Sequence, residues 1–183
     1  MQNIIYKSEN IIPWDTQSAF KMTSYNCSME EHMVFCYLKA YVHGKDLVLC
    51  SYCFSENPKR DKNLQLYINL NPENRDNVLK IEYDYFGPGN MYLNEKQLQD
   101  TSGIGYSSFR TDDEQGFYWC GETVIKADAI SRLAGTQLRE KSVVTLNLVQ
   151  TFENGDFSVL CGDATAEKHI AEENMGVFVI LDY

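Results

Sequence analysis

Apolar and aromatic side chains in this sequence recur at every second position or in short blocks, and turn-forming residues separate the blocks. This period of two is typical of β-strands, whereas a helix repeats its apolar face about every 3.6 residues. The clearest hairpin joins strands over residues 33–42 and 47–54 through a turn at 43–46. The pattern therefore predicts a mostly β chain.

Further strands are predicted along the rest of the chain, with turns at residues 71–74 and 87–90 and a long polar connection over 94–116. One short helix is predicted over 126–133, because Gly135 is well placed to end it. So many short strands favour an all-β, jelly-roll-type antiparallel β-sandwich with one short helix. The further strands cover residues 64–70, 78–86, 91–93, 117–125, 143–150, 156–160 and 176–181.

Length and charge limit the organisation and the partners of the chain. At 183 residues, with no internal repeat and no Pro/Ser-rich linker, residues 1–183 are expected to form a single domain. Acidic residues outnumber basic ones by 26 to 16, which gives a net charge of −10. Such a surface repels phosphate groups, so neither nucleic acid nor an anionic membrane is an expected partner.

The sequence carries no recognisable targeting segment. Residues 1–14 mix charged and amide side chains among the isoleucines, so they lack the continuous apolar region of a signal peptide. The longest apolar stretch, residues 176–181, is far shorter than the roughly 20 residues of a membrane helix. We therefore expect a cytoplasmic protein whose six cysteines are reduced, unless a leader has been removed.

The motifs that usually carry catalysis or metal binding are weak here. Cys50 and Cys53 have CxxC spacing, but residues three apart on a strand point to opposite faces, which disfavours a metal or dithiol site. The three histidines are scattered, and no serine lies in a Gly-x-Ser-x-Gly elbow. Glu82 with Asp84, or the acidic run 112–114, leaves a small glycan-active enzyme as one alternative. We predict no catalytic residues, no metal and no cofactor.

Tyrosine is the informative residue type, with twelve copies. Proteins bind sugars by laying the apolar face of the sugar on an aromatic ring while amides and carboxylates bond to the hydroxyl groups. In the stretch 65–69, Gln65, Tyr67 and Asn69 alternate with aliphatic residues, so these three side chains are expected on one face of the strand and the aliphatic ones on the other. Tyr85 and Tyr92 follow near the next turns, where a sandwich presents ligand-binding loops.

In the order of its motifs the chain resembles the family 9 carbohydrate-binding modules and family-9-like domains. The likeness spans most of the sequence, and it rests on segments that match strands of that family. These segments are residues 47–56, 63–68, 83–90, 119–125, 147–150 and 175–179.

The resemblance implies a jelly-roll sandwich that binds a saccharide without hydrolysing it. The chain departs from the family pattern at Gln65, where Glu is usual, at Gln150, where Arg is usual, and at Lys126, where Pro is usual. Xylanase-linked members hold a sugar between two tryptophans, but here only Trp14 and Trp119 exist, and Trp119 matches a scaffold strand. No compact Asp/Asn cluster maps onto the structural calcium of some relatives.

These observations predict a non-catalytic carbohydrate-binding domain for an unknown saccharide. The main alternative is an interaction or scaffold domain that kept the fold and lost the sugar site. The ligand site is expected on the face that carries Gln65, with Glu122 and Asn147 added from the family positions. The predicted ligand-binding residues are Gln65, Tyr67, Asn69, Tyr85, Tyr92, Glu122 and Asn147.

Overall fold

The computed structural model describes residues 3–22, 24–25, 36–55, 64–84, 87–114, 116–151, 157–162 and 174–183. Strands dominate this part of the chain, accompanied by one helix, α1 (Ala127–Ala134), and one 3-10 turn, η1 (Trp14–Thr16), so the predicted all-β class is confirmed. The strands are β1 (Asn3–Ser8), β2 (Phe20–Lys21), β3 (Ser24–Tyr25), β4 (Cys36–His43), β5 (Asp46–Ser55), β6 (Leu64–Asn69), β7 (Val78–Asp84), β8 (Gly87–Leu93), β9 (Lys96–Gln97), β10 (Ile104–Asp113), β11 (Gly116–Ile125), β12 (Val143–Thr151), β13 (Phe157–Val159) and β14 (Gly176–Asp182).

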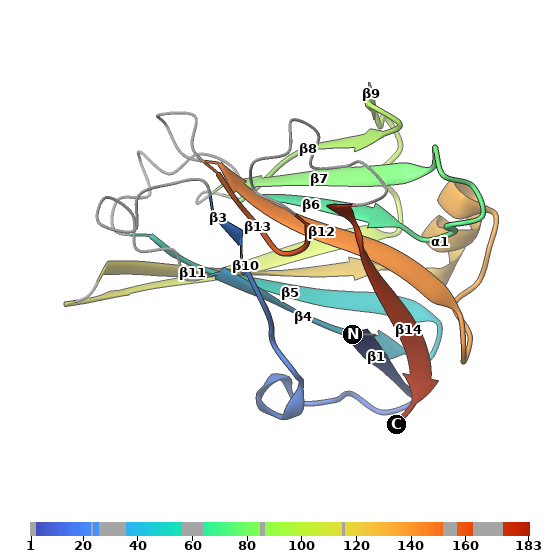
Figure 1. Ribbon diagram of the computed structural model, residues 1–183, viewed down its shortest axis with the longest axis horizontal. Helices are drawn as coiled ribbons and strands as arrows, with labels where there is room; N and C mark the ends of the chain where they lie inside the picture. Colours follow the sequence, from blue (N-terminus) through green and yellow to red (C-terminus); the bar gives the residue numbers. More distant parts are fainter. Residues whose placement is uncertain are drawn as a thin grey trace.

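One hydrogen-bonded sheet runs in the order β10-β11-β5-β4-β1-β14-β12-β6-β7-β8-β9 and curls over itself into a sandwich. Figure 1 shows the two layers: β10, β11, β5 and β4 form what we call the first layer, and β12, β6, β7 and β8 form the second. Strands β1 and β14 join the layers. Because β1 pairs in parallel with both β14 and β4, the sheet is mixed at this junction, whereas the other pairings are antiparallel.

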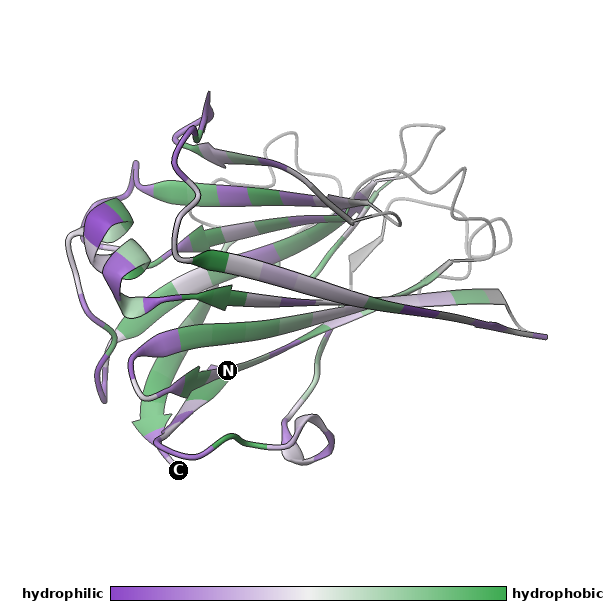
Figure 2. Cartoon of the chain, turned by 180° about the vertical axis from the view of Figure 1, so that it is seen from behind, coloured by the Kyte–Doolittle hydropathy of each residue, from purple (hydrophilic) through white to green (hydrophobic). Residues whose placement is uncertain are grey.

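The core lies between the layers and follows the predicted alternation. In the first layer β4 turns Leu38, Ala40 and Val42 inward, and in the second layer β6 turns its three aliphatic residues inward. Figure 2 shows hydrophobic residues mostly along the strands and hydrophilic ones on most turns. Helix α1 packs Ala129 and Ile130 on one end of this core and ends at Gly135, whose φ of 64° suits glycine, as predicted.

Several features of the chain differ from the sequence-based prediction. Strand β1 and the two-residue strands β2, β3 and β9 were not predicted, and residues 87–90 belong to β8 instead of a turn. Pro88 lies near the start of β8 and pairs with Tyr83 of β7, whereas the pairing of β8 with β9 involves Tyr92 and Leu93 at the other end of the strand. The connection over 94–116 contains β10, a strand at the sheet edge whose mostly polar residues gave no apolar alternation.

Trp119 is a core residue, as the family resemblance implied. It is 5% exposed on the inner face of β11. Further along the inner face, Tyr106 lies against Gly121, where an added Cβ would come within 2.7 Å of the ring, and stacks on the buried Tyr83 at 5.2 Å. Tyr83 in turn shares a 2.5 Å hydrogen bond with Thr123. These tyrosines stabilise the contact between the layers and are not on the outer surface.

Candidate functional site

The outer face of the second layer carries part of the predicted site. Strand β6 buries Leu64, Leu66 and Ile68 in the core, so Gln65 and Tyr67 point away from it, as their parity predicts. Pairing extends this face sideways, because Tyr67 lies opposite Asn147 of β12 on one side and Lys80 of β7 on the other. A single row of outward side chains therefore crosses β12, β6, β7 and β8, ending at Tyr92 opposite Lys80.

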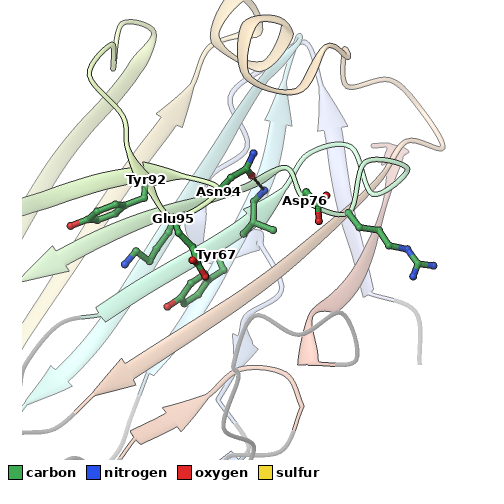
Figure 3. Close-up of a pocket in the computed structure, with 8 residues that line it drawn as sticks. Tyr67, Asp76, Tyr92, Asn94 and Glu95 are labelled. Carbon is green, nitrogen blue, oxygen red and sulfur yellow. Dashed lines mark hydrogen bonds between the residues drawn. The ribbon is translucent and has the colours of Figure 1, made fainter.

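An open pocket of about 600 Å³ lies at the Tyr92 end of this row (Figure 3). Its strand wall is formed by Tyr67, Val78, Lys80 and Tyr92, and the turns after β6 and β8 supply the rest. In the view of Figure 3, Glu95 lies between the two tyrosine rings. The residues that line the pocket are Tyr67, Arg75, Asp76, Val78, Lys80, Tyr92, Asn94 and Glu95.

The turn that carries Asn94 and Glu95 is held in place by the strand beside it. Both residues have positive φ, 52° and 64°, a conformation that asparagine tolerates better than most residues. A hydrogen bond stabilises this conformation of the turn: Oδ1 of Asn94 accepts from the backbone N–H of Val78 at 3.0 Å. This bond ties the turn to the start of β7 and fixes one wall of the pocket.

Lys80 is the central charged group of the face. Its Nζ donates to Oε1 of Glu82 at 2.8 Å and lies 4.1 Å from the ring centroid of Tyr92, a cation–π distance. The ion pair is partly shielded from water, since 26% of the Lys80 side chain and 17% of the Glu82 side chain are exposed. Lys80 therefore places a positive charge at the pocket wall, and the negative charge of Glu82 balances it.

Tyr67 presents a protonated hydroxyl group to the same region. Its hydroxyl donates to Oε1 of Gln65 at 2.6 Å, so the phenol oxygen keeps acceptor capacity. Burial raises the pKa of Tyr67 to about 12, and the negative charges of Glu82 and Glu95 act in the same direction. Tyr67 thus stays neutral at any physiological pH and combines an apolar ring with a polar tip.

Asn69 and Asn147 share this face but have their amides committed to the backbone. Asn69 donates to the carbonyl of Asn74 at 3.0 Å and accepts from the N–H of Asn71 at 2.9 Å, which orders the turn after β6. Asn147 is fully buried; its Nδ2 donates to the carbonyls of Asn174 and Cys161, and its Oδ1 accepts from the N–H of Cys161. Both side chains therefore stabilise the backbone of neighbouring segments.

Glu122 lies on the other layer, so the expectation that it shares a face with Gln65 is wrong. Strand β11 pairs with β5 and β10 in the first layer, and Glu122 is on its outer side. Its Oε2 accepts a 3.0 Å hydrogen bond from Nε1 of Trp14, and Lys39 donates to the Trp14 carbonyl at 2.5 Å. The resemblance to the family placed Glu122 on a strand, but it did not show which layer of the sandwich contains that strand. Tyr85, also predicted for the site, lies outside the described residues.

Sequence reasoning missed the charged half of the pocket. Lys80 has the outward parity of β7, but only the pairing of β7 with β6 and β8 reveals that it lies between Tyr67 and Tyr92. Arg75, Asp76 and Glu95 lie in or beside turns, where the sequence gave no indication of a pocket. The register of strands distant in sequence is the missing information.

The candidates for catalysis or metal binding find no further support in the described residues. Glu82 is paired with Lys80, and Asp112 and Glu114 are exposed near the end of the β10–β11 hairpin. Within the described ranges no group of three or more His, Cys, Asp or Glu side chains is arranged to hold a metal ion. No helix in those ranges has the length and apolarity needed to cross a membrane. Cys50 and Cys53 do point to opposite faces, since Cys53 packs in the core cluster and Cys50 contacts Cys120.

Comparison with known proteins supports the fold. No protein-family profile matches the sequence. No curated protein sequence matches it either. Among solved structures, a candidate carbohydrate-binding protein from Bacteroides uniformis ATCC 8492 superposes with a TM-score of 0.74 at 10% identity, covering 98% of this chain and 99% of that one.

Two solved structures of a family 9 carbohydrate-binding module from Caldicellulosiruptor kristjanssonii are also similar. The complex with glucose gives a TM-score of 0.70 at 7% identity, covering 100% of this chain and 97% of that one. The complex with cellotriose gives 0.67 at 7% identity, covering 100% and 95%. The expected resemblance to this family is confirmed at the level of the fold: the chain has the β-sandwich of family 9 carbohydrate-binding modules.

Proposed function

We propose that this protein is a non-catalytic carbohydrate-binding domain and that the saccharide binds in the pocket between Tyr67 and Tyr92. The observation that carries the proposal is the pocket itself, in which two partly exposed tyrosines lie among amide, carboxylate and cationic groups on an open sheet face. This combination suits a sugar, which has apolar C–H faces and a rim of hydroxyl groups. The similarity to carbohydrate-binding structures supports the same class of ligand.

The polar groups of the pocket can both donate hydrogen bonds to sugar hydroxyl groups and accept hydrogen bonds from them. Glu95 and Asp76 supply acceptors, Arg75 and Lys80 supply donors, and the Tyr67 oxygen can accept a further bond. The volume of about 600 Å³ is within the range of small-ligand sites. The ion pair of Lys80 with Glu82 balances charge in the wall, which favours a neutral saccharide over a sugar acid.

Catalysis is not part of the proposal, which follows the carbohydrate-binding structures that share the fold. Glu82 is paired with Lys80, and the two carboxylates that line the pocket, Asp76 and Glu95, come from different turns. A glycosidase needs two carboxyl groups about 5 to 10 Å apart on either side of the scissile bond. Release of reducing sugar from soluble glucans by the purified chain would contradict this part of the proposal.

The test uses saturation-transfer NMR titrations with glucose and cellotriose. Stacking on one aromatic ring contributes on the order of 1 kcal/mol, so we expect a dissociation constant near millimolar for a monosaccharide. Tyr92→Ala should weaken binding by about fivefold. Phe109→Ala is the matched control, because Phe109 is an exposed aromatic residue on the first layer.

Equal losses in both variants would place the ligand elsewhere. No binding of either sugar, or of longer β-glucans, by the folded wild-type protein would favour a scaffold domain that kept only the fold.

A further inference from the structure

Two cysteines on the outer face of the first layer lie close enough to react with each other. Cys50 of β5 and Cys120 of β11 are 70 residues apart in sequence, and their sulfur atoms are 3.1 Å apart. Both side chains point outward from the sheet, since Cys50 lies opposite Glu122 and Cys120 lies opposite Tyr52 on the outer face. The two positions are diagonal neighbours on adjacent antiparallel strands. Both cysteines are free thiols.

The two thiols have different surroundings, which gives each a different reactivity. Cys50 is 6% exposed and Cys120 is partly exposed. The hydrogen bond between them, followed by burial, raises the pKa of Cys50, and the same bond lowers the pKa of Cys120. When Cys50 is the donor, this bond favours a thiolate at Cys120, the sulfur that solvent can reach, and the thiolate is the nucleophilic form.

We propose that Cys50 and Cys120 are a reversible oxidation site, in which Cys120 reacts first with a peroxide and Cys50 then closes a disulfide between β5 and β11. This site is separate from the proposed sugar pocket and does not depend on it. The pair lies on the first layer, whereas the pocket lies on the second.

The chemistry balances with hydrogen peroxide as the oxidant. The Cys120 thiolate attacks one peroxide oxygen, the O–O bond breaks, and hydroxide leaves while the sulfur becomes a sulfenic acid. The Cys50 thiol then loses its proton and attacks that sulfur, so that the S–O bond breaks, the S–S bond forms and water is released. Two electrons pass from the two sulfurs to the peroxide, which ends as two molecules of water.

Reversibility follows from the position of the pair. Diagonal neighbours on antiparallel strands are farther apart than directly opposite residues, so the sheet must adjust locally when the bond forms. Strained or exposed disulfides are the ones that thiols reduce readily. A small dithiol should therefore restore both free thiols.

Cys36 and Cys53 provide an internal control. They lie directly opposite each other on β4 and β5, but they face the core and are 4% and 1% exposed. Peroxide cannot reach them without unfolding, whereas it can reach Cys120. A cross-link at this buried pair would mean that thiol exposure does not determine the reaction.

The experiment treats the fully reduced full-length protein with a small excess of hydrogen peroxide and maps its peptides without reduction. We expect one disulfide, Cys50 to Cys120, which dithiothreitol removes. Cys50→Ser should block the cross-link and leave a sulfenic acid at Cys120 that dimedone traps. Cys120→Ser should leave Cys50 unmodified, and Cys53→Ser should leave the cross-link unchanged.

The proposal is overturned if the dominant disulfide joins another pair or if Cys120 reacts no faster than Cys36. Should the serine variants fold poorly by circular dichroism, the rate of iodoacetamide labelling at each cysteine of the wild-type protein decides. Fastest labelling at Cys120, with loss of that labelling after peroxide, supports the site, and uniform labelling contradicts it.

Discussion

The outer faces of the two layers both carry tyrosines, but they use them differently. On the second layer, Tyr67 and Tyr92 line an open pocket together with charged side chains. On the first layer, Tyr37 and Tyr52 stack on each other, with ring centroids 4.9 Å apart and planes within 8°. A ring whose face already contacts another ring cannot offer that face to a sugar. The number of aromatic residues on a face is therefore a poorer guide to a site than the space beside them.

Polar groups follow the same division. On the first layer Glu122 and Lys39 bind the N-terminal segment through Trp14, which also packs edge-on against Tyr41 at 5.2 Å. On the second layer the pocket groups Asp76 and Glu95 border open space. The outward polar groups Glu122 and Lys39 of the first layer thus bond to the chain itself, whereas Asp76 and Glu95 of the second layer line the pocket.

The largest expected effect concerns the core that both faces share. Trp119→Ala should lower the free energy of unfolding by about 3 to 5 kcal/mol, because a large buried ring leaves a cavity between the layers. Chemical denaturation followed by circular dichroism measures the loss. Trp14→Ala is the matched control, with a smaller effect expected because Trp14 is only partly buried. An unchanged denaturation midpoint for Trp119→Ala would contradict its place in the core.

The second effect tests whether Asn147 supports the second layer or binds ligand. Asn147→Ala removes three hydrogen bonds and leaves the N–H of Cys161 and the carbonyl of Asn174 without this partner. We expect a loss of about 2 to 3 kcal/mol in the free energy of unfolding. Asn90→Ala, at an exposed residue that accepts one bond from Gln97, should change stability far less. Normal stability with lost sugar binding would return Asn147 to the ligand site.

A smaller effect is expected where the first layer holds the N-terminal segment. Glu122→Ala removes the carboxylate that accepts from the Trp14 indole, and it should lower the free energy of unfolding by about 1 kcal/mol and shift Trp14 fluorescence. Glu140→Ala matches the change in charge at an exposed position. Sugar affinity should stay the same in both variants. A loss of affinity in Glu122→Ala alone would show that the first layer takes part in binding.

The smallest effect is a shift in titration. The pKa of Tyr67 is raised from 10.0 to about 12 mainly by burial, so its phenolate should appear late in an ultraviolet titration of wild-type protein against Tyr67→Phe. The folded chain holds this proton more tightly than the unfolded chain. The resulting stability is fully present below pH of about 10 and is lost as the pH rises through about 12. A Tyr67 phenolate already formed near pH 10 would mean that the pocket wall is more open than described.

Local alternation predicted much of this structure, because the period of two depends only on neighbouring residues. It assigned β4, β5, β6 and β12 and the outward direction of Gln65 and Tyr67. It could not place Lys80 beside Tyr92 or Glu122 on the other layer, since both depend on which distant strands pair. It also missed β10, where a polar edge strand carries no apolar repeat.

The most direct test of the account maps the sugar on the protein. Titration of ¹⁵N-labelled protein with cellotriose should shift the amide signals of the pocket, above all those of Tyr67, Lys80, Tyr92 and Glu95. Signals of Tyr37, Tyr52 and Glu122 on the first layer should stay in place. Shifts centred on the first layer would contradict the assignment of the site to the second layer. Absence of any shift at millimolar sugar would contradict carbohydrate binding by this pocket.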